Sequence, residues 1–132
     1  RAEKYDGRLI VKTNIPMDDL PNYYGASTIC IAPTLGVQAC MGVSIKEAMA
    51  SGRPIIASDS GGIPEAIRHY EEGCIVPLQN GGIDNDIFAQ QIVDLLNMPE
   101  MVKLLGKNAR VRCASVFSVN ASIKKYLELL AS

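Results

Sequence analysis

The stretch VSIKEAMASGRPIIASDSGGIPEAI, residues 43–67, decides the fold. It runs from helix formers that end at Gly52, through the apolar run RPIIAS (53–58), to a double glycine at 61–62 that leads into IPEAI. Glycine after a run of helix formers ends a helix, and a short apolar run bounded by turn residues is typical of a buried strand. The stretch therefore predicts helix, strand, glycine turn and helix in succession.

The same alternation extends over the first sixty per cent of the chain. Helix formers fill the segments between the apolar runs, and each of these segments ends at or near a glycine. Apolar strands joined by helical crossovers predict a parallel sheet covered on both faces, so the fold class is α/β and Rossmann-like. The predicted strands are 8–13, 28–33, 53–58 and 73–78, and the predicted helical segments are 16–27, 43–52 and 63–73.

The remaining third is predicted to be helical, with an apolar packing face on each long helix. Pro99 and Ser118 are residue types that begin helices. The two faces are Phe88, Ile92, Leu95 and Leu96, and Ile123, Tyr126, Leu127 and Leu130.

Composition predicts one soluble globular domain spanning residues 1–132. The 48% of hydrophobic residues are enough for a core, and 13 basic against 14 acidic residues leave a net charge of −1. Neither sign gathers into a block that would bind nucleic acid, and no apolar run reaches the roughly 20 residues of a membrane span. We therefore expect no nucleic-acid partner.

The cysteines predict a reducing compartment. Cys30 and Cys74 lie in apolar runs, and the four cysteines are scattered without a Cys-x-x-Cys pair, so we expect neither zinc nor disulfides and place the chain in the cytoplasm. Because it begins with Arg1 instead of Met, we expect it to be part of a longer protein.

Two glycine-bearing loops are candidate binding elements. Ligands of open parallel sheets bind beyond the carboxyl ends of the strands, where helix N-termini offer N–H groups to anions. The loop 33–42, with Gly42, and the loop 58–64, with Gly61 and Gly62, both leave strands at that edge. Alternatively, these glycines only allow tight turns with positive φ.

Glu47 is the candidate polar ligand. It lies one turn into the predicted helix, four residues after Val43, where it can point back toward the 33–42 loop. Its carboxylate can accept hydrogen bonds from both hydroxyls of a ribose. The alternative is an acidic residue that stabilises the helix dipole.

Three other polar positions favour structural roles. Glu65 follows Pro64 as an ordinary acidic first turn. The cluster Asp84–Asp86 precedes an apolar helix, which predicts an N-cap and not a metal site. His69 is followed by acidic residues and is expected in a solvated turn.

With these residues laid out, the 43–67 stretch resembles the signature of glycosyltransferase family 4, whose retaining enzymes have the GT-B fold. The flanks LIVKTNIPMDDLPNYYGASTICIAPT and EEGCIVPL are similar to the same domain. The resemblance implies a single nucleotide-sugar-binding domain over 1–132, the C-terminal half of a GT-B architecture, lacking its first strand and helix. It implies that an Arg and a Lys for the diphosphate belong to that missing strand and helix, and that the acceptor-binding N-terminal domain lies further upstream.

The resemblance also implies roles for particular residues. The family has two glutamates seven residues apart around a Gly-Phe-Gly-like loop, and Glu47 matches the second, which holds the ribose. The first, which contacts the sugar, falls on Ala39, and the loop reads Cys40-Met41-Gly42. Met41, Gly42 and Val43 would then lie at the diphosphate.

Two residues near the start of the chain complete the implied donor site. Asn14 and Ile15 would frame the base, next to Thr13, where family members carry glycine. No residue is implied as catalytic.

The implied activity is transfer of a sugar from a nucleotide diphosphate to an acceptor hydroxyl with retained configuration, without cofactor or metal. The acceptor, a glycan, lipid or small molecule, is open, and the enzyme would be cytoplasmic or peripheral to the inner face of a membrane. The fragment alone is expected to be inactive. Ala39 keeps open a non-catalytic nucleotide-binding or scaffold domain; a flavin-type or phosphoacceptor module is disfavoured because the chain lacks paired acidic residues after a first strand.

Overall fold

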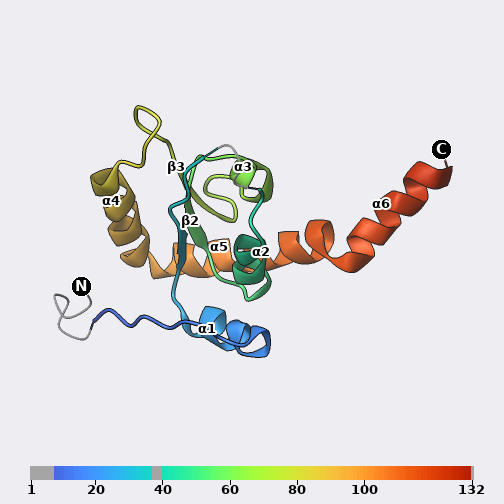
Figure 1. Ribbon diagram of the computed structural model, residues 1–132, viewed down its shortest axis with the longest axis horizontal. Helices are drawn as coiled ribbons and strands as arrows, with labels where there is room; N and C mark the ends of the chain where they lie inside the picture. Colours follow the sequence, from blue (N-terminus) through green and yellow to red (C-terminus); the bar gives the residue numbers. More distant parts are fainter. Residues whose placement is uncertain (1–7, 37–39, 132) are drawn as a thin grey trace.

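The computed structural model describes residues 8–36 and 40–131. A small sheet lies at the centre with helices around it, and the last helix projects away from this body (Figure 1). The elements are the 3₁₀ turn η2 (Met17–Asp19), α1 (Leu20–Ala26), β1 (Cys30–Ala32), α2 (Val43–Ala50), β2 (Ile55–Ser58), α3 (Ile63–Ala66), β3 (Gly73–Val76), α4 (Asn85–Leu96), α5 (Pro99–Arg112), the π-helical η3 (Cys113–Phe117) and α6 (Val119–Ala131).

The described strands form one parallel sheet in the order β1-β2-β3. Ile31 is in register with Ile56, and Ile56 with Cys74. Three of the four predicted strands are therefore confirmed, together with a helix in each predicted segment between them and the α/β class. The segment predicted to be helical over 63–73 is helical only over Ile63–Ala66, because the chain becomes extended at Ile67.

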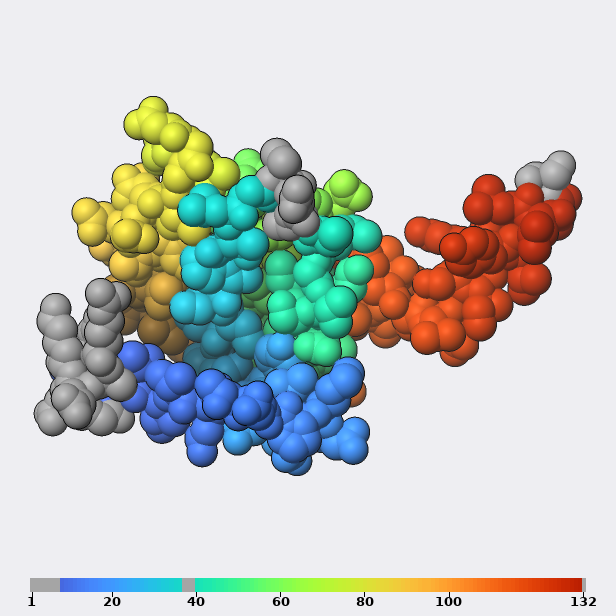
Figure 2. All heavy atoms as spheres, viewed as in Figure 1, coloured from blue at the N-terminus to red at the C-terminus, as the bar shows by residue number. Residues whose placement is uncertain are grey.

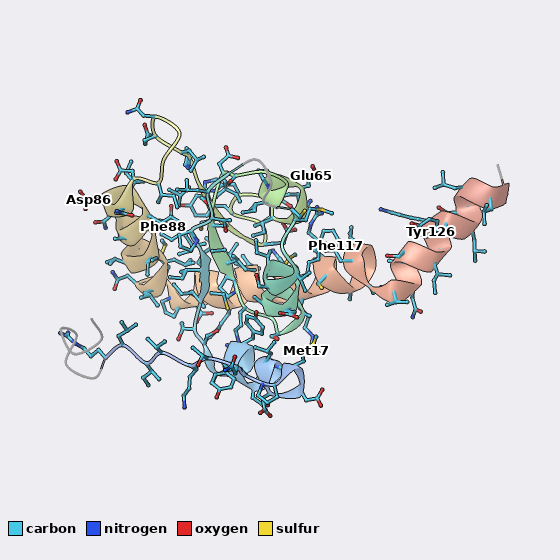
Figure 3. The ribbon with its side chains drawn as sticks, viewed as in Figure 1. Met17, Glu65, Asp86, Phe88, Phe117 and Tyr126 are labelled. Atoms are coloured by element: carbon cyan, nitrogen blue, oxygen red, sulfur yellow. The ribbon has the colours of Figure 1, made fainter. Side chains whose placement is uncertain are left out.

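Strand β2 connects the two halves of the core. All four of its residues are buried, and their side chains alternate between the faces. On one face Ile55 and Ala57 pack with residues of α2 and α3, and on the other Ile56 packs with Phe88 of α4 and Leu105 of α5. The sheet is thus covered on both faces, as predicted. Figure 3 shows Phe88 directed from α4 toward the sheet.

Two helix starts use the predicted N-caps. Asp84 accepts hydrogen bonds from the backbone N–H groups of Asp86 and Ile87, at 3.0 and 3.1 Å. Ser118 accepts one from the N–H of Ala121 at 3.2 Å. Because each side chain satisfies N–H groups that a helix leaves free at its start, both cap predictions are confirmed.

The predicted strand at 8–13 is wrong. These residues form no strand, and Leu9, Ile10 and Val11 are 46, 75 and 67% exposed. A β-branched run becomes a strand only where a neighbouring strand and covering layers bury it. In the described residues β1 is an edge strand of the sheet, its Ile31 is 55% exposed, and no strand pairs with its outer side.

The expected packing face of the last helix is also not buried. Helix α6 forms, but it has no buried residue, and Figure 2 shows it as an arm that leaves the body. Ile123, Tyr126, Leu127 and Leu130 are 51 to 84% exposed. Periodicity correctly predicted the helix; it could not predict whether any surface lies opposite its apolar stripe.

No helix among the described residues is long and apolar enough to cross a membrane. All four cysteines, each within the described ranges, are free thiols. Burial raises the pKa of the Cys74 thiol to about 11, which agrees with its expected role as a small core residue.

Gly106 allows the closest approach between α5 and the turn after α2. A Cβ built there would lie 2.3 Å from the carbonyl oxygen of Gly52, whereas a Cβ on Gly25 in α1 would meet nothing within 4 Å. Gly106→Ala should lower the free energy of unfolding by about 1–3 kcal/mol. Gly25→Ala should change it little or raise it by up to about 1 kcal/mol. Urea denaturation of both variants checks this, and equal stability of the two would contradict it.

Candidate functional site at the carboxyl edge of the sheet

Two buried serines hold the loops at the carboxyl edge together. The hydroxyl of Ser58 accepts a hydrogen bond from the N–H of Thr34 at 2.9 Å and donates to the carbonyl of the same residue. The hydroxyl of Ser60 donates to the carbonyl of Gly36 at 2.9 Å. Both serines are at least 96% buried, so these bonds replace strand pairing where the sheet ends.

Gly62 brings the second loop against the first. A Cβ on Gly62 would lie 3.2 Å from the backbone nitrogen of Met41, a contact tighter than side chains normally make. Gly61 has φ of 53°, in the left-handed region that favours glycine. The predicted loops therefore meet, with Met41 and Gly62 in contact.

Gly42 turns the chain into α2. It is the N-cap residue, with φ of 62°, and no side chain caps this helix start. Val43, the first helical residue, is 73% exposed. Since the first N–H groups of a helix have no partner within it, the start of α2 is open to an anion.

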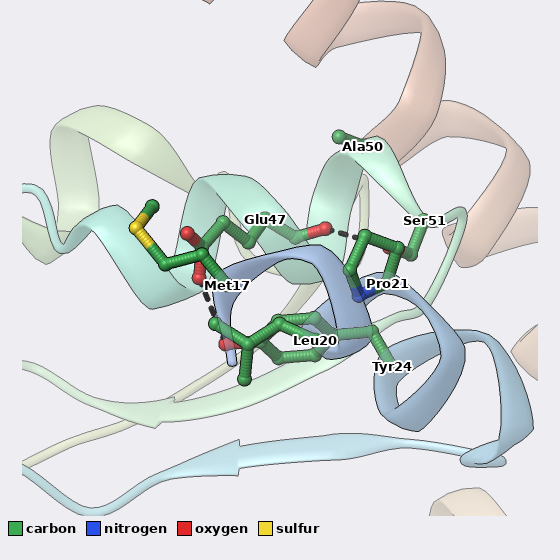
Figure 4. A pocket seen from close by; sticks show the side chains of 7 residues that line it. All are labelled: Met17, Leu20, Pro21, Tyr24, Glu47, Ala50 and Ser51. Atoms are coloured by element: carbon green, nitrogen blue, oxygen red, sulfur yellow. Dashed lines mark hydrogen bonds between the residues drawn. The ribbon is translucent and has the colours of Figure 1, made fainter. Parts of the chain in front are cut away.

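A cavity of about 270 Å³ lies between α1 and α2 (Figure 4). Apolar groups make up most of its wall, and Glu47 is the one acidic side chain among its described lining residues, which include no basic one. The lining residues are Met17, Leu20, Pro21, Tyr24, Glu47, Ala50 and Ser51.

Glu47 is held by Tyr24 from the facing helix. The phenol donates to Oε2 of Glu47 at 3.1 Å, and Figure 4 shows the carboxylate beside Met17. Burial, the hydrogen bond to Glu47 and the negative charge of Glu47 raise the pKa of Tyr24 to about 12. The carboxylate is thus half-buried in the cavity and turned toward α1, and none of the described residues of the 33–42 loop lines that cavity.

The structure brings the predicted site residues into two groups. Met41, Gly42, Val43, Gly61 and Gly62 lie where the two loops meet the start of α2, and Glu47 lies one turn along in the cavity.

The other predicted positions lie apart from these groups. Asn14 and Ile15 precede η2 and do not line the cavity. Family members carry glycine at the position of Thr13, and here the positive φ that favours glycine occurs one residue later, at Asn14, with φ of 54°. Ala39 lies outside the described residues.

Sequence reasoning missed the apolar wall of the cavity. Met17, Leu20 and Tyr24 are spaced i, i+3 and i+7, a helical face that pointed to packing and not to a ligand. Nothing in the sequence paired Tyr24 with Glu47, 23 residues away.

The structural roles expected for the remaining polar residues fit their contacts. Glu65 is exposed in the first turn of α3 (Figure 3). His69 is exposed, and its Nδ1 accepts a hydrogen bond from the N–H of Ile75 at 2.9 Å.

Comparison with known proteins identifies the family. The family model described as glycosyl transferases group 1 matches residues 1–98, which include both loops, α2 and Glu47. The chain belongs to this family. This chain spans about a third or less of the length of the curated relatives that it matches.

Solved structures place the chain as a C-terminal domain of the GT-B fold. Sucrose-phosphate synthase from Thermosynechococcus elongatus is 30% identical, with a TM-score of 0.78 over 98% of this chain and 33% of its own. The C-terminal domain of the group 1 protein LpcC from Francisella tularensis is 23% identical, with a TM-score of 0.63 over 83% of this chain and 53% of its own. HepE of Anabaena, solved with UDP-glucose, is 20% identical, with a TM-score of 0.69 over 86% of this chain and 30% of its own. The last two show the fold alone.

The raised pKa of Tyr24 predicts a specific loss of stability in alkali. Its folded pKa of about 12 lies above the ordinary tyrosine value of 10.0, so between these values the folded state binds more protons than the unfolded state. The stability that comes from the Tyr24 proton is fully present below the pKa of Tyr24 in the unfolded state. It is lost as the pH rises through the pKa of Tyr24 in the folded state. Urea unfolding at about pH 9 and about pH 11 should therefore show a smaller loss for Tyr24→Phe than for the wild type. Equal losses would contradict the shift.

Proposed function

We propose that this chain is the donor-binding domain of a retaining glycosyltransferase, which transfers a sugar from a nucleotide diphosphate to an acceptor hydroxyl. The observation that carries the proposal is the position of Glu47, a half-buried carboxylate in an apolar cavity one turn from an uncapped helix start. This arrangement suits a ligand that presents a polar diol and an anionic group to adjacent sites.

The cavity suits the nucleoside part of the donor. A carboxylate has about four lone-pair sites, and the hydrogen bond from Tyr24 occupies one of them, so the carboxylate of Glu47 can still accept from two ribose hydroxyls. Met17 and Leu20 offer the apolar surface against which a base packs. No charged group opposes Glu47 in the described wall, which favours a neutral polyol over a phosphate at this point.

The start of α2 suits the diphosphate. Its N–H groups and the positive end of the helix dipole would stabilise the charge that develops on the leaving group. Gly42, the N-cap residue, places no side chain on these N–H groups. The mechanism needs no metal, and the residues of this chain would act by binding and orienting the donor.

The comparisons support the proposal at the level of the family. The chain matches glycosyl transferases group 1, and HepE, which shares the fold, binds UDP-glucose. Because the chain spans about a third or less of its curated relatives, we assign turnover to the full-length protein and expect the acceptor site in the rest of it.

Ala39 supports a second candidate, a domain that binds nucleotide without transferring sugar. A methyl group cannot accept a hydrogen bond from a sugar hydroxyl, so the sugar contact implied by the family resemblance is absent at this position. Measured sugar transfer by the full-length protein would exclude this alternative.

Glu47→Gln tests the nucleoside site. The full-length protein should bind at least one of UDP-, GDP- and ADP-glucose, and Glu47→Gln should weaken the best of them at least about tenfold, or about 1.4 kcal/mol, because a neutral amide loses the charge-assisted bonds. Isothermal titration calorimetry measures this. Glu100→Gln on the exposed face of α5 is the matched control and should bind like the wild type. If none of the three sugars binds, the proposal fails.

Gly42→Val tests the diphosphate site. A Cβ at this position, with φ of 62°, is strained by about 1–2 kcal/mol, and it would lie 3.1 Å from Cδ1 of the buried Ile45, so valine would disturb the start of α2. We expect the full-length variant to fold, since domain stability is about 5–15 kcal/mol, and to lose donor affinity more than about tenfold.

Gly81→Val provides the control for Gly42→Val. Gly81 has φ of 77° and open space around its Cβ, so valine there adds the backbone strain of a positive φ without the contact that a Cβ on Gly42 would make with Ile45. If both variants retain full affinity, loop 33–42 is a structural turn and the phosphate site lies elsewhere.

A further inference from the structure

Tyr24 is the partner that restricts the Glu47 carboxylate. Its hydroxyl donates to Oε2 at 3.1 Å across the cavity from α1 to α2. A glutamate side chain has three rotatable bonds, and ordering a side chain of this length costs conformational entropy. The hydrogen bond therefore partly orders the Glu47 side chain before a ligand binds.

Tyr24 is itself held on rigid structure. Its half-buried ring packs against the core cluster that contains Ile45 and Ala48. The end of its helix is tied down as well, because Arg53 donates to the carbonyl of Gly25 and Ser27 donates to the carbonyl of Tyr24 at 2.8 Å. The phenol thus occupies a defined place relative to α2.

We propose that Tyr24 is a positioning residue that orients Glu47 to recognise a vicinal diol, so that it determines the preference of the site for ribonucleotides over 2′-deoxyribonucleotides. The inference rests on the proposed function. With Oε2 bound by the phenol, rotation of the carboxylate is restricted, and Oε1 together with the remaining lone pair of Oε2 would accept hydrogen bonds from the ligand. Two simultaneous hydrogen bonds from adjacent hydroxyls depend on this orientation of the carboxylate more than a single hydrogen bond does.

The hydroxyl of Tyr24 remains a donor at every working pH. Because its pKa is raised to about 12, the phenol stays protonated in neutral and mildly alkaline solution. The proposed orientation of Glu47 should therefore not vary with pH over that range.

Tyr24→Phe in the full-length protein tests the proposal. The probes are the best-bound of UDP, GDP and ADP and its 2′-deoxy counterpart, titrated by calorimetry. The wild type should prefer the ribonucleotide by about tenfold, and Tyr24→Phe should reduce this preference to less than about threefold, mainly by weakening the ribonucleotide. Loss of packing alone would weaken both probes equally and leave the preference unchanged.

Tyr23→Phe is the matched control, because Tyr23 is the neighbouring residue of the same helix, is 47% exposed and does not line the cavity. It should keep the wild-type preference. In a Glu47→Gln background, Tyr24→Phe should cause no further loss of preference, since its effect acts through Glu47. A further loss there would overturn the positioning role.

The outcomes separate the two proposals. If the wild type binds none of the three nucleotides, the donor-binding function fails and the role of Tyr24 fails with it. If the wild type binds with a ribose preference that Tyr24→Phe retains, only the role of Tyr24 is overturned.

Discussion

The burial of β2 on both faces is the constraint on which the rest of the structure depends. Its side chains alternate between two core clusters, so neither cluster forms unless helices cover the sheet on both sides. Fully burying an isoleucine stabilises the fold by about 1.5–3 kcal/mol, and Ile55 and Ile56 point to opposite clusters. Because helical connections join parallel strands, every strand ends at the same carboxyl edge of the sheet. The loops 33–42 and 58–64 both follow strands, so both lie at that edge.

At that edge, side-chain hydroxyls take over from strand pairing. Ser58 and Ser60 bond to the backbone of Thr34 and Gly36, and Gly62 lets its loop contact Met41. A small residue is needed at Gly62 because a Cβ there would come closer to the backbone of Met41 than side chains normally do. The start of α2 lies where these loops meet and its first residue, Val43, is exposed, so the proposed anion site lies beside the contacts that close the fold.

The cavity next to this edge combines two kinds of surface. Apolar side chains from η2 and α1 form one wall, and a single carboxylate projects from α2 on the other. The chain belongs to the glycosyl transferases group 1, and under the proposed function these two surfaces would receive the base and the ribose of a nucleotide-sugar donor. Ala39 is the position where this chain departs from the pattern expected around Glu47.

Much of the fold and part of the site could be predicted from the sequence. The alternation of apolar runs with glycine-ended helices predicted three parallel strands, their crossovers and two N-caps, because these depend on local periodicity and on residues within a few positions. The glycine loops and Glu47 were found for the same reason. Their roles toward a ligand stay predictions.

Only the tertiary structure decided the features that need a partner distant in sequence. The run 8–13 has the composition of a strand but no covering layer, and the apolar stripe of α6 faces no surface of the described chain. Tyr24 and Glu47 meet because α1 packs on α2, a contact that no local pattern encodes. The sequence by itself determined which segments form helices and most strands, since those preferences are local. The tertiary structure alone decided which faces are buried and how Glu47 is held, because burial and long-range hydrogen bonds exist only after the chain has packed.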